Sequence, residues 1–238
     1  MSRNVLRLFW ISLFPLLLLA SSCAPKRVSL PSFQGGDIRA ALAEKRTITE
    51  IETTFSISLG RHDETNGAEM QGDGALTISD FGSAAGSDSG SGSNSGDFDL
   101  RIYSLGFLAM EVTSRDGLLR SSPKLEETKK LILTEGLRDC IFWWNMGDFV
   151  IDEEDGMYVL RDGSRAVWVD KKSFLPLRQV VFLDDGKELN ISYEEPVQEK
   201  GRWYQSRIRI DFLQYTVSLS VKTVDAKPAE TPCVYCSL

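Results

Sequence analysis

The four cysteines are the residues of this sequence best suited to chemistry, because a thiol can accept a lipid, form a redox pair or act as a nucleophile. Cys233 and Cys236 have the spacing of a redox dithiol, but they follow Lys227-Pro228-Ala229 and lack the strand-to-helix context that activates a thiolate. A disulfide between them, or an idle pair of thiols, is favoured over redox catalysis. Cys140 stands in an apolar stretch, which predicts a buried free thiol.

Other catalytic chemistry has little support in the sequence. His62 is the only histidine, and it stands beside Arg61 and Asp63 in an expected hairpin loop, where a solvated side chain is the usual case. We find no zinc-ligand spacing, no serine–histidine–aspartate set, no phosphate-binding glycine loop and no dinucleotide fingerprint. The acidic run 152–155 lacks the alternating oxygen ligands of a calcium loop, so we interpret it as a solvated turn. We therefore expect no enzyme, no bound metal and no cofactor.

The first 22 residues have the layout of a secretory signal. Two arginines precede an apolar run over 8–20, and two small serines follow it. The apolar run is shorter than the roughly 20 residues that a permanent transmembrane helix needs, and Pro15 interrupts it. A signal peptide over 1–22 is therefore favoured over a lasting membrane span.

Cys23 ends the run Leu19-Ala20-Ser21-Ser22-Cys23, which resembles the bacterial lipobox. The resemblance implies that a lipid is attached to the Cys23 thiol and that cleavage makes Cys23 the first residue of the mature chain. The alternative is an ordinary cleaved signal with a chance cysteine. Two or three acyl chains anchor a protein firmly to a membrane. Ala24 stands where an aspartate would resemble an inner-membrane retention signal, which favours the periplasmic face of the bacterial outer membrane.

Charge and composition limit what the rest of the chain can be. Without residues 1–22 the formal charge changes from −7 to −9, because two arginines and no acidic residue are removed. An acidic chain disfavours a nucleic-acid partner, and 42% hydrophobic residues exclude global disorder. The sequence predicts a tether over 23–36, one domain over 37–225 and a tail over 226–238.

Hydrophobic periodicity predicts that this domain is mainly β, with a few helices (α+β). Alternation of apolar and polar residues indicates half-buried strands, and Asp-Gly pairs indicate tight antiparallel hairpins. Gly72 and Gly74 are expected to bend their strand or to admit another group close to its backbone. The expected strands are 51–59, 69–79, 98–103, 108–112, 157–160, 165–170, 177–183, 188–193, 203–212 and 215–223.

Three other segments interrupt the β pattern. A helix is expected over 37–46 with Asp37 as its N-cap. One face of this helix carries Ile38, Ala41, Leu42 and Lys45. A Gly/Ser-rich stretch over 82–96 is expected to be a loop. A helical insert is expected over 123–145, as one helix to residue 133 and a second from 135 to 144.

The helical insert is the most apolar part of the mature chain, with apolar residues at 131–133, 137 and 141–144. A packed domain core is the best explanation for any one of these residues. An incompletely closed antiparallel sheet with helices over its concave side would instead enclose an apolar cavity. The sequence leaves a filled core and an open cavity as alternatives.

The order of these elements resembles the lipoprotein carrier and receptor superfamily of the Lol pathway over about residues 37–223. The local stretches 100–106 (LRIYSLG), 174–179 (FLPLRQ) and 185–193 (DGKELNISY) add to the resemblance. It implies a LolA/LolB-like antiparallel unclosed half-barrel with a helical lid, whose cavity receives the acyl chains of client lipoproteins. Two features depart from the family. No residue here is matched to the exposed loop leucine of the receptor, and the Gly/Ser-rich loop is not part of its pattern.

The resemblance suggests a non-enzymatic outer-membrane lipoprotein that binds acylated lipoproteins or other amphiphiles and assists the localisation of lipoproteins or lipids. The alternative is a structural or interaction lipoprotein with a closed core, which would scaffold an envelope complex through its exposed strands or the 82–96 loop. The residues expected to line an acyl-chain cavity are Phe55, Ile57, Leu76, Leu100, Ile102, Leu108, Met110, Leu133, Leu137, Ile141, Phe142, Trp143, Trp144, Trp168 and Phe182.

Overall fold

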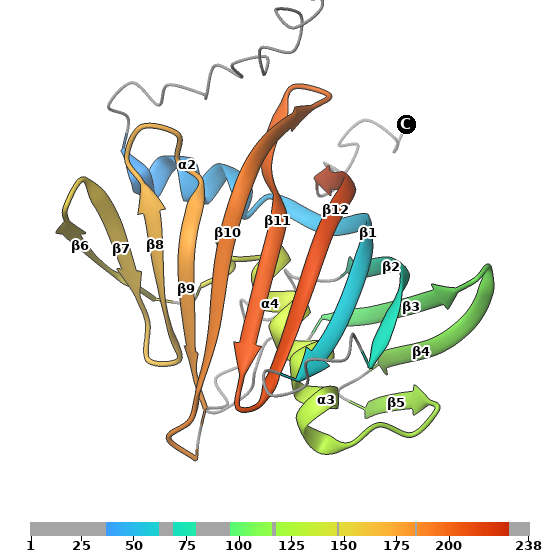
Figure 1. Ribbon diagram of the computed structural model, residues 1–238. Helices are drawn as coiled ribbons and strands as arrows, with labels where there is room; N and C mark the ends of the chain where they lie inside the picture. Colours follow the sequence, from blue (N-terminus) through green and yellow to red (C-terminus); the bar gives the residue numbers. More distant parts are fainter. Residues whose placement is uncertain are drawn as a thin grey trace, which may run out of the picture. The chain divides into compact units, whose positions relative to one another are not determined.

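Twelve antiparallel strands form one continuous sheet in the part of the chain that the structure describes (Figure 1). This computed structural model describes residues 37–61, 69–79, 96–115, 118–146, 148–183 and 185–228. The strand order is β5-β4-β3-β2-β1-β12-β11-β10-β9-β8-β7-β6, so β5 and β6 are the two edges and the sheet does not close. The predicted antiparallel, unclosed half-barrel is confirmed.

Ten of the twelve strands correspond to strands predicted from the alternation of residues. The strands are β1 (Ile48–Arg61), β2 (Met70–Ser79), β3 (Asp97–Ser104), β4 (Phe107–Arg115), β5 (Leu118–Ser122), β6 (Val150–Glu154), β7 (Met157–Arg161), β8 (Arg165–Asp170), β9 (Pro176–Phe182), β10 (Glu188–Glu199), β11 (Arg202–Phe212) and β12 (Tyr215–Pro228). The two edge strands, β5 and β6, were not predicted. No residue of β5 or β6 is buried, so neither strand shows the apolar alternation of a half-buried strand.

The acidic run 152–155 is a correction to the sequence analysis. Residues 152–154 belong to the edge strand β6, and only Asp155 lies in the turn that follows. Arg161 forms ion pairs with Asp152 and Glu154, and Lys171 pairs with Glu153. Arg161 on the neighbouring strand β7 and Lys171 in the turn after β8, together with the tolerance of a sheet edge for charge, allow the acidic residues to be extended.

Several segments discussed above lie outside the described residues. They are the predicted signal peptide 1–22, Cys23 and the tether, His62, positions 82–95 of the Gly/Ser-rich loop, and the Cys233 and Cys236 pair.

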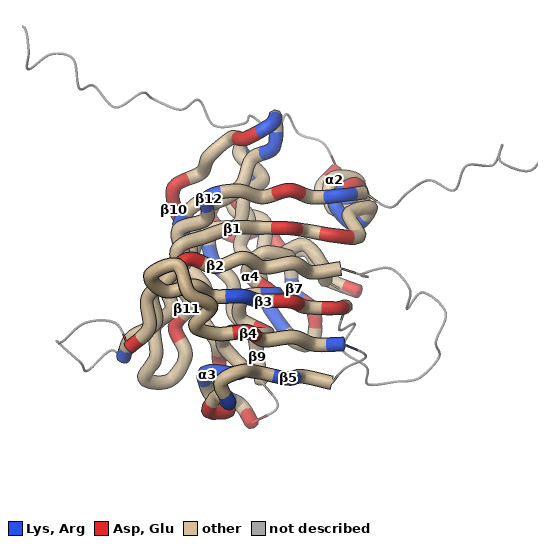
Figure 2. Tube along the Cα trace, turned by 90° about the vertical axis from the view of Figure 1, so that its right-hand side faces the viewer, with Lys and Arg blue, Asp and Glu red and all other residues tan. Residues whose placement is uncertain are grey.

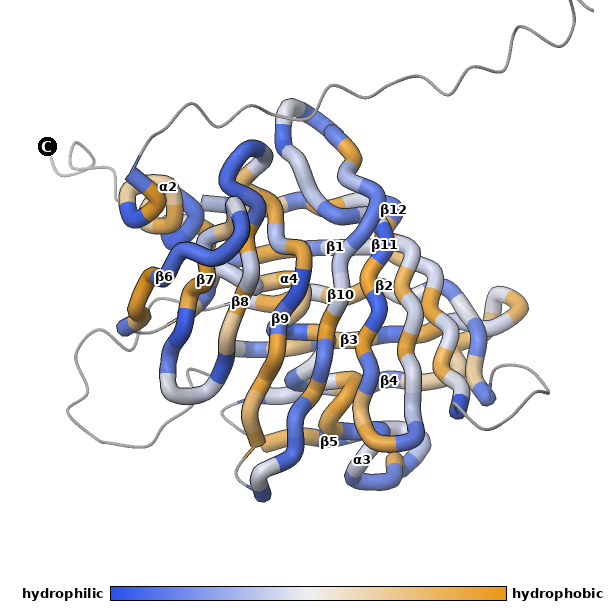
Figure 3. Tube along the Cα trace, turned by 60° about the vertical axis from the view of Figure 1, so that its left-hand side comes forward, coloured by the Kyte–Doolittle hydropathy of each residue, from blue (hydrophilic) through white to orange (hydrophobic). Residues whose placement is uncertain are grey.

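Alternating burial explains why the strands form one sheet. In β1, Phe55, Ile57 and Leu59 are buried, and the residues between them are more exposed. Phe55 and Ile57 are paired with Val221 and Leu219 of β12, which are also buried. Figure 3 shows the same alternation of hydrophobic and hydrophilic positions along the strands. One face of the sheet therefore forms the core, and the other meets solvent.

Gly74 of β2 lies directly opposite Phe55 of β1, and the Phe55 ring occupies the space beside its backbone. A Cβ at position 74 would lie 2.2 Å from Cε2 of Phe55. The prediction that a glycine of this strand admits another group close to its backbone is confirmed.

Gly74→Ala is expected to lower the free energy of unfolding by about 1–3 kcal/mol, because the new methyl group overpacks a buried ring. Urea unfolding followed by circular dichroism would measure the loss. The matched control is Gly163→Ala, since no heavy atom lies within 4 Å of a Cβ at that turn glycine. Equal stability of the two variants would contradict the close contact with Phe55.

The helices also agree with the sequence in part. The first is α2 (Ile38–Lys45), and the side chain of its N-cap Asp37 accepts a hydrogen bond from Arg39 N at 2.9 Å, as predicted. The insert is a single helical segment rather than two helices, made of α3 (Glu127–Leu131), a π-helical turn η1 (Ile132–Gly136) and α4 (Leu137–Ile141). Wider π-turn hydrogen bonding replaces the break expected near residue 134.

The helical segment and the residues after it, 127–146, are here called the lid. The lid lies against one face of the sheet (Figure 1), and Ile132, Leu133 and Leu137 are completely buried in this packing. A Cβ at Gly136 would lie 3.4 and 3.5 Å from side-chain atoms of Leu189 and Ile210, so η1 approaches β10 and β11 closely. The predicted helical lid is confirmed. Across the described ranges, no helix has the length and apolar content needed to cross a membrane.

Candidate functional site

A cavity of about 410 Å³ lies where α2, the end of the lid and one end of strands β9 to β12 meet. Its walls come from segments that are distant in the sequence but are brought together by the sheet. The lining residues are Ala41, Glu44, Lys45, Thr47, Ile48, Cys140, Ile141, Trp143, Trp144, Ser173, Phe174, Leu175, Pro176, Tyr193, Arg202, Trp203, Tyr204, Gln205, Ile208, Val221, Val224, Ala226 and Pro228.

The lining residues divide into a buried floor and an exposed rim. The floor contains Phe174, Leu175, Ile208 and Val221, which are all buried and apolar. The rim contains exposed residues, including Glu44, Thr47 and Arg202. An apolar floor with a few polar groups at its entrance is the usual composition of a small-molecule pocket.

Lys45 is positioned at the cavity by the register of α2. Leu42 is buried in the core three residues earlier, and Ala41 lines the cavity four residues earlier, so Lys45 lies on the same helical face. Figure 2 shows basic positions on this helix. The Lys45 ammonium is 4.8 Å from the ring centroid of Trp144 and 5.6 Å from that of Trp143. These are cation–π distances.

The charge of Lys45 is poorly solvated. Burial lowers its pKa, Glu44 acts in the opposite direction, and the nearby charge of Arg202 lowers the pKa further. Among the described residues, no hydrogen-bond acceptor or carboxylate lies within bonding distance of Lys45 Nζ. The indole faces of the lid are therefore its main partners.

Trp143 and Trp144 owe their position to contacts just beyond them in the lid. Arg46 donates a hydrogen bond to Met146 O at 2.5 Å, and Arg165 donates one to Asn145 O. The two indoles meet edge to face, with ring centroids 5.6 Å apart. Two side-chain hydrogen bonds to the backbone directly after Trp144 thus hold the aromatic wall of the cavity.

The floor contains a small buried polar network. Tyr193 lies with its hydroxyl 2.9 Å from Gln179 Oε1, to which it donates, and 3.2 Å from the Cys140 carbonyl oxygen. Gln205 donates through Nε2 to Pro176 O at 3.0 Å, whereas its buried Oε1 has no hydrogen-bond partner. Burial raises the pKa of the Cys140 thiol well above its usual value. Cys140 is the buried free thiol that the sequence predicted, and such a thiol is a poor nucleophile.

Several solved structures are similar to the structure of this chain, all at low sequence identity. Neither a family model nor a curated protein matches its sequence. A DUF1329 family protein from Desulfovibrio piger is similar at 10% identity and a TM-score of 0.47, over 81% of this chain and 91% of that one. A LolA superfamily protein from Nitrosomonas europaea is similar at 12% identity and a TM-score of 0.43, over 81% and 94%. A domain named as an outer membrane lipoprotein-sorting protein, from Vibrio parahaemolyticus, is similar at 14% identity and a TM-score of 0.43, over 81% and 93%.

Three of the fifteen residues expected to line a cavity border this one: Ile141, Trp143 and Trp144. Most of the others are packed in the core and do not border it. These core residues are Phe55, Ile57, Leu76, Leu100, Ile102, Met110, Leu133, Leu137 and Phe142. Apolar alternation in the sequence correctly predicted that these residues are buried. A buried residue, however, need not lie beside open space.

The remaining three residues, Leu108, Trp168 and Phe182, are corrected by the structure. The exposed fractions of Leu108 and Phe182 are 53% and 43%. Trp168 is half-buried and lies between the guanidinium groups of Arg161 and Arg178, 5.6 and 4.9 Å from its ring centroid. A register shift between Ile102 and Tyr103 displaces the pairing of β3 with β4 by one residue, which moves Leu108 to the opposite face. Trp168 and Phe182 follow the buried residues Val167 and Val181, so regular alternation turns them away from the core.

The sequence analysis missed most of the cavity residues, including Lys45, Phe174, Tyr193 and Gln205. The one available signal was Lys45, a charged residue on the otherwise apolar face of the first helix. A lysine among apolar neighbours is rarely buried without a reason. The other residues come from loops and strand ends, where periodicity carries no information about a cavity.

A second feature absent from the sequence analysis is an exposed apolar hairpin tip. Leu105, Phe107 and Leu108 are 94%, 78% and 53% exposed at the turn between β3 and β4, and this hairpin extends away from the lid (Figure 1). Leu105 and Gly106 both have positive φ angles, 52° and 83°, as in a tight hairpin turn. Leu105 is the most exposed of the three residues.

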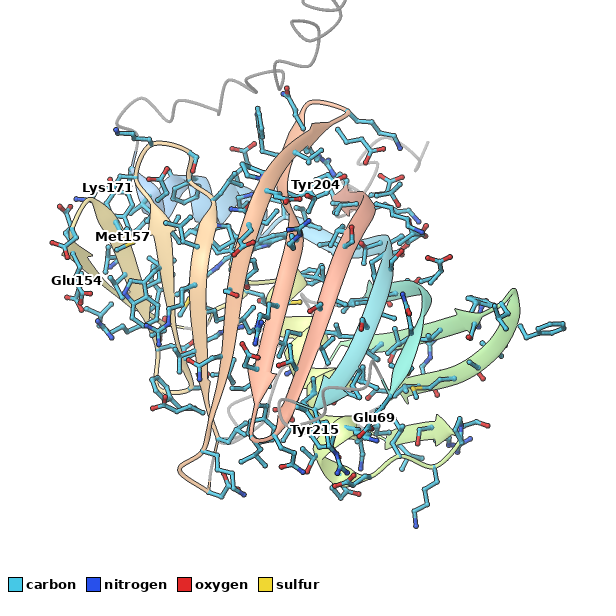
Figure 4. The ribbon with its side chains drawn as sticks, in the orientation of Figure 1. Glu69, Glu154, Met157, Lys171, Tyr204 and Tyr215 are labelled. Carbon is cyan, nitrogen blue, oxygen red and sulfur yellow. The ribbon has the colours of Figure 1, made fainter. Side chains whose placement is uncertain are left out.

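The other end of the lid is held by a charged cluster that Figure 4 labels in part. Tyr215 is buried and donates its hydroxyl hydrogen to Glu126 Oε2 at 3.2 Å, just before α3. Lys129 of α3 pairs with Glu69, which also pairs with Arg61 at 2.9 Å. The lid is thus attached to the sheet at both ends. In the described part of the chain, no group of three or more acidic, histidine or cysteine side chains could hold a metal ion.

Proposed function

We propose that this chain is a lipid-anchored, non-enzymatic lipoprotein of the bacterial outer membrane that binds an acyl chain between α2, the lid and β9–β12. In this role it assists the localisation of lipoproteins or lipids. The anchor is Cys23, and the domain lies on the periplasmic face. The observation that carries the proposal is the cavity itself, with its buried apolar floor and its aromatic wall.

The composition of the cavity suits an acyl chain better than a polar metabolite. Its volume of about 410 Å³ is within the roughly 300–1,000 Å³ of ligand pockets. Trp143, Trp203 and Phe174 supply broad apolar surfaces, and the polar floor groups are few. Removing a chain from water into such a site is favourable by about 0.8 kcal/mol for each buried methylene.

The hairpin tip supports a role at a lipid surface. The apolar side chains at 105, 107 and 108 are all exposed at this one turn. An exposed apolar patch commonly marks a surface that contacts a membrane or another protein. Such a tip can enter the interfacial region of a bilayer to which Cys23 already tethers the chain. The cavity would then take up or release its acyl chain close to the membrane.

Tryptophan fluorescence provides a direct test, because Trp143, Trp144 and Trp203 line the cavity and Trp168 does not. Dibromostearate is added to the full-length chain, purified in a bile-salt detergent that has no acyl chain. Bromine quenches an indole only at contact, so saturable quenching is expected. The quenching should survive Trp168→Phe and should largely disappear in the triple variant Trp143→Phe, Trp144→Phe, Trp203→Phe.

Mass spectrometry of an organic extract provides the second readout. A co-purifying acyl lipid at one-to-one stoichiometry, beyond the lipid on Cys23, is expected. A folded chain that neither retains amphiphile nor shows saturable quenching would argue instead for the interaction lipoprotein with a closed core.

A further inference from the structure

We propose that the cavity selects an acyl chain bearing an anionic head group, with Lys45 as the group that binds the anion. This inference rests on the proposed function and names its ligand class. The ligand is a single-chain anionic amphiphile, either a fatty acid or a lysophospholipid, and their shared chemistry is an oxyanion at one end of an acyl chain.

The first support is the state of the Lys45 ammonium group. It is desolvated, it lies over two indole rings, and no carboxylate of the described residues pairs with it. The Lys45 side chain is half-buried, and cation–π contacts return only part of the hydration that its ammonium loses. Charges withdrawn from water in proteins are normally paired, so a ligand oxyanion would complete the site.

The second support is the charge of the cavity rim compared with the charge of the chain. The charged lining residues are Lys45 and Glu44 of α2 and Arg202 of β11. The guanidinium of Arg202 is held by a hydrogen bond to Ala226 O at 2.5 Å. Two cations against one exposed acid make the rim positive, although the formal charge of the chain is −7. A positive entrance to an apolar floor matches an anion followed by an acyl chain.

The third support is size. A cavity of about 410 Å³ lies near the lower end of the range for ligand pockets, roughly 300–1,000 Å³. This space suits one chain better than the three chains of a triacylated lipoprotein. An amphiphile with one chain and one head group therefore fits both the volume and the charge.

The test compares dibromostearate with its neutral glycerol monoester, using tryptophan quenching of the full-length chain in bile-salt detergent at neutral pH. The wild-type chain is expected to bind the acid about tenfold more tightly than the ester, since a charge-assisted hydrogen bond contributes that much. Lys45→Met should remove this preference by weakening the acid and leaving the ester unchanged. Lys45→Arg should restore it. Displacement by palmitate or by lysophosphatidylglycerol identifies whether the carboxylate or the phosphate is the better anion.

The matched control is Lys187→Met, because Lys187 pairs only with Asp185 in the turn after β9 and does not border the cavity. Its acid preference should equal that of the wild-type chain. Equal binding of acid and ester by the wild-type chain, or an unchanged preference in a folded Lys45→Met variant, overturns the inference and leaves the proposed function intact. Failure of both ligands to bind overturns both proposals.

Discussion

Trp144→Asp is expected to abolish acyl-chain binding and to leave the sheet folded. Trp144 lines the cavity and is half-buried, so its removal takes away part of the aromatic wall without opening the core. The new carboxylate would lie next to Lys45, whose ammonium is 4.8 Å from the present ring centroid. It would place a charge in the apolar cavity and compete with a ligand anion for the same lysine.

Organic extraction with mass spectrometry measures the bound lipid, and circular dichroism follows the fold. The control is Phe182→Asp, because Phe182 was expected to line a cavity but is 43% exposed and does not border this one. Phe182→Asp should retain ligand. Complete unfolding of Trp144→Asp would place Trp144 in the core and contradict a peripheral lid end. Loss of ligand in Phe182→Asp alone would show that the cavity lies elsewhere.

Arg165→Met is expected to lower the free energy of unfolding by about 3 kcal/mol and to weaken ligand binding as well. The Arg165 side chain is 10% exposed and lies 3.6 Å from both Asp139 of the lid and Asp162 of the sheet. It also donates to Asn145 O, just after Trp144. Asp139 keeps its ion pair with Arg138 at 3.2 Å, but the carboxylate of Asp162, only 11% exposed, loses the charge of Arg165. Removing one partner of a buried ion pair is the costly case.

Arg161→Met is the matched control, since Arg161 pairs with Asp152 and Glu154 at the exposed sheet edge. An exposed pair contributes about 0–1 kcal/mol, so this change should be nearly neutral. Urea unfolding compares the two variants, and quenching by dibromostearate compares their cavities. If Arg165→Met were as stable as Arg161→Met, the lid would not depend on this buried arginine.

The strands of this fold could be predicted where one face is buried and the other is wet. The run from Phe55 to Leu59 alternates because each apolar residue enters the core and the polar residues between them are more exposed. Asp-Gly pairs in the sequence also predicted turns that the structure contains. Asp155 and Gly156, for example, have the positive φ angles of a tight hairpin turn. The edge strand β6 was missed because none of its residues is buried, so its acidic run shows no apolar alternation.

The candidate site could be predicted to a much smaller extent. Trp143 and Trp144 were expected at a cavity because they are apolar and lie in a helical insert, and they do border one. Leu108 was misplaced because a register shift changes which face of β4 it occupies. Trp168 was misplaced because it alternates with the buried residues Val167 and Val169. Gln205 and Phe174 were not expected at all, since they meet only when β11 and the loop before β9 lie side by side.

The sequence by itself determined ten of the twelve strands, the first helix and the antiparallel class, because periodicity and turn chemistry act between residues close together in the chain. It also predicted, through the lipobox at Cys23, how the chain is anchored. Only the tertiary structure decided which buried residues border open space and which fill the core, because this depends on the packing of α2 and the lid against a sheet that does not close. Lys45 shows the difference most clearly. Its position on an apolar helix face could be read from the sequence, but its contacts with two tryptophans exist only where residues a hundred positions apart meet.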